Sequence, residues 1–197
     1  MAVTINGNTG VVTGIAVGGL PDGIVDTDML AANAVTAAKR GAGAILQVVN
    51  VEKTDVASTT SSSYTDISGM SASITPSSSS NKILVSVFVP QYVAPDIIHI
   101  VLCTGDGTSI LQGSTVSGKE SMTIGAYSGN NSIGEAWYGT NPATIVKLHS
   151  PNTTSSVTYK LRWKINNSTG YLNRNQSDGS QYAMRCASTI TLMEIAA

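Results

Sequence analysis

The chain has 197 residues, of which 12% are charged and 5% aromatic, and its formal net charge is -1. This near-neutral balance, without any run of like charges, offers no electrostatic surface for nucleic acid or an anionic membrane. The longest apolar stretches are too short to insert across a bilayer, and the first ten residues, MAVTINGNTG, lack the basic and apolar regions of a secretory signal.

Residues 1–25 are expected to form an extended arm. This segment is rich in glycine, has no aromatic residue and cannot build a closed core, so a free copy of it should be disordered. We therefore expect the arm to be held by a partner or by other copies of the chain. The apolar side chains available for that contact are Val3, Ile5, Val11, Val12 and Ile15.

Residues 26–43 predict one short helix. Asp26 or Thr27 can act as its N-cap, and a basic last turn followed by Gly41 marks its end. Its apolar side is a thin stripe at helical spacing: Leu30, Ala34, Ala37 and Ala38. So short a helix is marginal in water, and the stripe must pack on something. Two alternatives remain open, namely identical helices around an axis or the C-terminal domain of the same chain.

Residues 44–197 change to the two-residue period of β-strands. AILQVVNVEK opens this region and ASTITLMEIAA closes it. NKILVSVFV and SVTYKLRWKI alternate between apolar and more polar positions, and Asp106-Gly107 predicts a hairpin within DIIHIVLCTGDGTSILQG. About ten short strands with regular turn signals predict an antiparallel β-sandwich, with a jelly roll as the first choice of topology. Periodicity leaves the strand order open.

The sequence contains no recognisable catalytic, metal-binding or cofactor-binding motif. Cys103 and Cys186 are far apart and are interpreted as small buried hydrophobes rather than a disulfide. His99 lies in an apolar strand and is expected to be a hydrogen-bonded structural residue, whereas His149 is expected to be solvated. No Asp, Glu or Cys stands at metal-ligand spacing from either histidine. We therefore predict a non-enzymatic protein without a metal or cofactor.

A few aromatic residues beside amide side chains could bind a host-surface glycan or protein. Aromatic rings stack on sugars while amides bond their hydroxyl groups. The alternative is that the aromatic residues belong to the core of the sandwich. The candidate contact residues are Trp137, Tyr138, Tyr171 and Asn173.

Three phrases of the sequence resemble one group of proteins. They are IVDTDMLAANAVTAAKRGAGAILQVV, SSSYTDISGMSASITPSSSSNKILVSVFV and ASTITLMEI. Together they resemble virion proteins of tailed bacteriophages, of the tail-fibre or structural type common in phages of cyanobacteria and marine bacteria. The resemblance spans most of the chain, but residues 91–121 carry no matching phrase.

The resemblance implies a homotrimeric appendage made in the cytoplasm of the host bacterium and located in the virion. The arm of residues 1–25 would dock on another virion protein, residues 26–43 would form a trimeric neck, and residues 44–197 would form the head. The leading expectation is a tail fibre or fibre-like adhesin. The alternative is a capsid decoration protein that stabilises the particle through the same arm and trimer. A glycan-degrading tailspike is disfavoured by the chain length and the lack of a repeated β-helix pattern.

Overall fold

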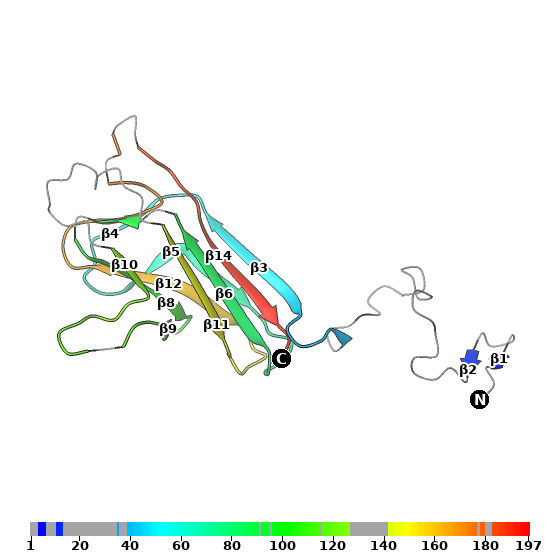
Figure 1. Cartoon of the computed structure of the whole chain (residues 1–197). Coiled ribbons are helices and arrows are strands. Elements are labelled where there is room, and N and C mark those ends of the chain that lie inside the picture. Colours follow the sequence, from blue (N-terminus) through cyan, green and yellow to red (C-terminus); the bar gives the residue numbers. More distant parts are fainter. Residues whose placement is uncertain are drawn as a thin grey trace. The chain divides into compact units, whose positions relative to one another are not determined.

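The computed structural model describes residues 4–6, 11–13, 35, 39–90, 92–94, 96–114, 116–126, 142–176, 178–179 and 183–197. The chain divides into two compact units, Met1–Arg40 and Gly41–Ala197. The first unit contains an antiparallel hairpin of β1 (Thr4–Asn6) and β2 (Val11–Thr13), in which Ile5 pairs with Val12 (Figure 1). Among the described residues, no helix is long and apolar enough to cross a membrane.

Most of the predicted helix lies outside the described residues. This holds for the whole predicted stripe and for two of the predicted arm contacts, which are Leu30, Ala34, Ala37, Ala38, Val3 and Ile15. Val35, which is described, lies in a bend and is 53% exposed. The helix and its self-association therefore stay predictions.

The described residues of the second unit form twelve strands. They are β3 (Ile45–Lys53), β4 (Ala57–Thr59), β5 (Thr65–Ile74), β6 (Lys82–Val89), β7 (Tyr92–Val93), β8 (Ile98–Thr104), β9 (Ser109–Leu111), β10 (Ile124–Ala126), β11 (Ala143–His149), β12 (Val157–Ile165), β13 (Gly170–Leu172) and β14 (Ser188–Ile195). As predicted, Asp106-Gly107 joins β8 to β9, and the backbone N–H of Gly107 donates to the carbonyl of Thr104. Gly107 has φ +90, which favours glycine.

Nine of these strands form two packed antiparallel sheets (Figure 1). One sheet has the order β11-β6-β14-β3, and the other has the order β10-β8-β12-β5, with β9 also pairing with β8. The pairs β3–β14, β5–β12, β6–β11 and β8–β10 are nested, so the chain folds like one long hairpin that is rolled into a sandwich. This connectivity is that of a jelly roll. The predicted antiparallel sandwich is confirmed.

The core lies between the two sheets and follows the predicted alternation. In β6, the odd-numbered residues Ile83 to Val89 are fully buried, while Phe88 on the other face is 44% exposed. In β12, Tyr159, Leu161 and Ile165 are fully buried, and the basic residues between them face outward. A two-residue period places alternate side chains on opposite faces, which is why these two strands were readable from the sequence.

The sequence analysis missed β5, which contains a bulge. On β12, Lys160 and Arg162 are two positions apart, but their partners on β5 are Ser71 and Asp66, which are five positions apart. The extra residues interrupt the alternation, and Gly69 within them has φ +80. A bulge of this kind removes the periodic signal on which strand prediction depends.

The core should respond to truncation far more strongly than the surface. Leu161→Ala removes a fully buried side chain between the sheets, and we expect it to lower the free energy of unfolding by about 2–5 kcal/mol. Val116→Ala, at a residue that is 58% exposed, is the control and should change it by less than about 0.5 kcal/mol. Urea unfolding measures both. Equal effects would contradict the placement of β12 in the core.

Candidate interaction surfaces

Asn173 was predicted to contact a receptor, and the structure contradicts this. Its side chain is fully buried after β13. The amide nitrogen donates to the carbonyls of Lys53 (2.8 Å) and Asp55 (3.0 Å), and the amide oxygen accepts from the hydroxyl of Ser188 (2.6 Å). Asn173 therefore joins the end of β3 to the beginning of β14, and its role is structural. Asparagine tolerates its positive φ of 62 better than most residues.

Tyr171 lies in β13, the middle strand of a small sheet with the order β4-β13-β7 at one end of the sandwich. It is half-buried, and the guanidinium of Arg174 lies 4.3 Å from the centre of its ring. Arg174 is held in turn by Asp178, at 3.0 Å, and Asp178 also contacts Arg185. The hydrogen bond from Arg185 is the main reason that the pKa of Asp178 is lowered. One face of the Tyr171 ring is thus already covered by a cation.

The other two predicted receptor contacts, Trp137 and Tyr138, lie outside the described residues. Of the four candidates, the structure therefore places Tyr171 and Asn173 near the same end of the sandwich. Only Tyr171 among those two has an exposed part.

The two histidines form no catalytic arrangement with the described residues. His99 on β8 is 2% exposed, and its Nδ1 lies 3.1 Å from Oε2 of Glu120. Neither ring nitrogen has a hydrogen bond of suitable geometry within the described part of the chain. Burial lowers the pKa of His99, although Glu120 opposes this. The predicted burial is confirmed, but the predicted hydrogen bond is not found.

His149 was predicted to be solvated, and it is instead half-buried against Tyr159. Its Nδ1 lies 2.8 Å from the phenol oxygen, with the rings edge to face. Burial, and then the charge of Lys147, lowers the pKa of His149, and burial raises the pKa of Tyr159 to about 12. Both groups are therefore neutral at pH 7, and the pair is structural.

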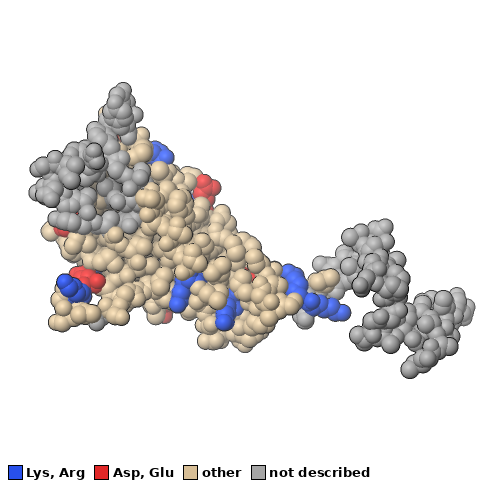
Figure 2. Space-filling view, viewed as in Figure 1, with Lys and Arg blue, Asp and Glu red and all other residues tan. Residues whose placement is uncertain are grey.

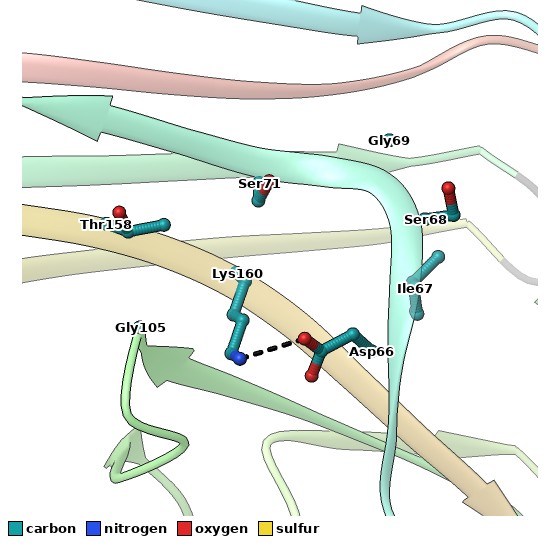
Figure 3. A pocket seen from close by; sticks show the side chains of 8 residues that line it. All are labelled: Asp66, Ile67, Ser68, Gly69, Ser71, Gly105, Thr158 and Lys160. Carbon is teal, nitrogen blue, oxygen red and sulfur yellow. Dashed lines mark hydrogen bonds and ion pairs between the residues drawn. The ribbon is translucent and has the colours of Figure 1, made fainter.

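A polar depression of about 420 Å³ lies on the outer face of the β12 sheet, where the bulge of β5 separates the strands. Its floor holds Lys160 and Asp66, whose charged groups meet at 2.9 Å (Figure 3). The remaining lining consists of three hydroxyl residues, together with Ile67 and two glycines: Ser68, Ser71, Thr158, Gly69 and Gly105. Because the ammonium and carboxylate already pair, the depression offers hydroxyl groups to a polar ligand but no unpaired acid or base to a reaction.

The described residues contain no group of three or more His, Cys, Asp and Glu side chains that could hold a metal ion. Cys103 is buried, as predicted, and Cys186 is partly exposed. Neither forms a disulfide within the described part of the chain.

Glu194 of β14 is an unexpected buried charge at the end of the sandwich where the first unit joins. It is 1% exposed. Its Oε1 accepts hydrogen bonds from the backbone N–H of Ser77 and from Asn81, both at 2.6 Å, and its Oε2 accepts one from Gln47 at 2.6 Å. Burial alone would raise the pKa of Glu194, but these hydrogen bonds outweigh it, and the pKa lies below its usual value of 4.5.

The same end of the sandwich fixes the entry of the chain. The N–H of Gly43 donates to the carbonyl of Ala196 (2.8 Å), and the N–H of Ala196 donates to the carbonyl of Ala44 (2.9 Å). The N–H of Ala197 donates to the side chain of Asn81. The residues directly before β3 are therefore hydrogen-bonded to the residue that follows β14.

The two outer faces of the sandwich differ in charge. On the β12 sheet, Lys160 and Arg162 pair with Asp66, and Lys164 pairs with Glu120 at 2.6 Å. The surface over β11, β6, β14 and β3 is almost free of charged side chains except near its margins (Figure 2). Charge patterning thus distinguishes a face with paired charges from one that is largely uncharged.

The chain was compared with protein families and with curated proteins. No protein-family model matches the chain, and no curated protein matches it.

The hydrogen bonds of Glu194 predict a defined pH dependence. Because the folded state lowers this pKa, the contribution of Glu194 to stability is complete above about pH 4.5 and is lost as the pH falls through the pKa of the folded state. Glu194→Gln should lower the free energy of unfolding at pH 7 by about 1–3 kcal/mol, because an amide cannot accept from every donor. Below pH 4.5 the variant should lose less further stability than the wild type.

Urea unfolding at pH 7 and pH 4 tests this, with Glu52→Gln on the neighbouring strand as the control. Glu52 is exposed, and its substitution should change the free energy of unfolding by less than about 0.5 kcal/mol at pH 7. If the Glu194 and Glu52 variants behave alike, the buried carboxylate is not the stabilising group.

Proposed function

We propose that this protein is a non-enzymatic structural component of a phage particle, a homotrimer anchored by its N-terminal arm. The observation that carries the proposal is the division of the chain into a complete jelly roll, Gly41–Ala197, and a separate unit, Met1–Arg40. The jelly roll buries its own core between two sheets. In this proposal the first unit serves as the attachment element, and the resemblance to tailed-phage virion proteins agrees with that use.

The small size of the hairpin in the first unit suggests that this unit needs a partner for stability. β1 and β2 have three residues each and form a two-stranded sheet, with no third strand among the described residues. An isolated hairpin of two strands is at best marginally stable in water. Contacts with another virion protein, through side chains such as Ile5, Val11 and Val12, would supply the missing stability.

The geometry of the head suits an appendage that presents one end outward. β3 begins beside the entry of the chain and ends at Lys53, whose carbonyl bonds Asn173 near the β4-β13-β7 sheet. Nine residues of strand separate these ends by about 30 Å. In a tail fibre or fibre-like adhesin, the end with Tyr171 would face the host, while the opposite end continues into the neck.

A capsid decoration protein is the second candidate, and a specific observation favours it. Asn173 is fully buried, and one face of Tyr171 is covered by Arg174, so two of the four predicted receptor contacts are engaged within the fold. A decoration protein needs no receptor. In that version the arm lies across capsid subunits, and the trimer stabilises the head of the particle.

The location of the protein in the particle separates the two candidates. Antibody labelling of virions in electron micrographs should place a fibre on the tail and a decoration protein on the capsid. An adhesin should also bind host cells as a purified protein, whereas loss of a decoration protein should make virions burst more readily on heating. The absence of the protein from purified virions would overturn the whole proposal.

The trimer makes a separate prediction. Light scattering of the full-length protein at micromolar concentration should give a mass about three times the 20.3 kDa of one chain. Ala34→Glu should weaken assembly, because it would place like charges near the axis of the proposed neck. Val116→Glu, on a loop of the head, is the matched control and should leave the mass unchanged. A wild-type mass near that of one chain would contradict the trimer.

A further inference from the structure

The outer face of the sheet β11-β6-β14-β3 carries a continuous apolar row. Register places Val48 beside Met193, Met193 beside Leu84, and Leu84 beside Leu148. The row thus crosses all four strands. Neighbouring positions on the same face add Ile45, Phe88 and Val146. We call these seven residues the apolar face.

Among the described residues, the exposed hydrophobic side chains are concentrated on this face. Eight large hydrophobic residues in the described part of the chain are exposed, and the apolar face holds five of them: Ile45 (51%), Val48 (55%), Phe88 (44%), Val146 (57%) and Leu148 (47%). Single exposed hydrophobic residues are ordinary, but a contiguous group of them marks a contact surface.

The polar groups on this face include one bonded pair, Thr191 and Asn50, beside the hydroxyl groups of Ser86, Thr189 and Thr144. The hydroxyl of Thr191 donates to Asn50 at 2.7 Å, so these central polar groups already bond each other. The charged residues at outward positions of these strands are Lys82 and Glu52, which have opposite signs and lie near opposite ends of the sheet. Copies of this face can approach without a net repulsion, and the bonded pair of Thr191 and Asn50 costs little to bury.

The size of the face indicates which kind of partner it fits. Four strands spaced about 4.8 Å apart and seven residues long cover about 19 Å by 23 Å. Around the three-fold axis of the proposed trimer each face is shared between two neighbours, so each pair of copies covers about 440 Å² in total, well below the roughly 1,000 Å² that a stable interface between independent proteins requires. Chains that are already tethered need less area, because the tether raises their local concentration to the millimolar range.

We infer that the apolar face packs against a second copy of this chain within the assembly. This rests on the proposed trimer, which supplies the tether. The point of tethering is adjacent to the face, because Ile45 directly follows the bonded entry segment Gly43–Ala44. Copies joined through residues 26–43 bring these ends of their heads together. The heads then form a close cluster and do not splay apart.

Thiol labelling of the full-length protein tests the inference directly. Val146→Cys lies on the apolar face, and Val116→Cys lies outside it at nearly the same exposure, 57% against 58%. Both are made with Cys186→Ser, because Cys186 is partly exposed, whereas Cys103 is 1% exposed. In the assembled protein, a maleimide reagent should label Cys at position 146 at least about tenfold more slowly than Cys at position 116. Light scattering on the same samples reports their mass.

Each outcome decides a different point. Slow labelling at position 146 in an assembled protein supports the inference. Equal rates in a trimer overturn it and leave the proposed function standing, and protection that appears only in whole virions would assign the face to another virion protein. Slow labelling in a monomer also overturns it, because a segment of the same chain would then cover the face. Equal rates in a monomer overturn both the inference and the trimer.

Discussion

The sandwich depends on the position of its last strand. β14 lies between β3 and β6, and its Ile190 and Leu192 are fully buried in the core. Without β14, one of the two sheets would be divided and the other would have nothing continuous to pack on. Residues from the two ends of the second unit must therefore meet before the core can close. Such long-range pairing makes folding cooperative and comparatively slow. The chain between β3 and β14 must lose conformational entropy before their stabilising contacts can form.

Polar groups at both ends of β14 help to set its register. At its start, the hydroxyl of Ser188 bonds the buried Asn173, and near its end Glu194 accepts hydrogen bonds from Asn81 and Gln47. A shift by one residue would turn the core face of the strand outward. It would also leave Glu194 without its donors. Burial of a carboxylate is costly, and the complete set of hydrogen bonds is what makes it compatible with a stable fold.

The two sheets divide the surface between different kinds of contact. The outer face of the β12 sheet carries ion pairs and the polar depression around Lys160 and Asp66, which suit solvent or a small polar ligand. The outer face of the β14 sheet carries the apolar face, which suits other copies of the chain. The entry segment and the Tyr171 end lie at opposite ends of β3. In the proposed assembly, the apolar face would serve contacts between copies, and the Tyr171 end would stay exposed.

The sequence by itself determined the class of fold and the inner faces of β6 and β12, because a two-residue alternation is a local property that the backbone converts directly into two faces. The burial of Glu194 could also have been predicted, because Glu194 continues the two-residue alternation of the buried Ile190 and Leu192. The bulge in β5 hid that strand, and the burial of Asn173 was unreadable because its partners lie far away in the sequence. Only the tertiary structure decided that β14 fills the gap between β3 and β6 and that five exposed hydrophobic side chains share one face, because strand pairing depends on the packing of the whole sandwich.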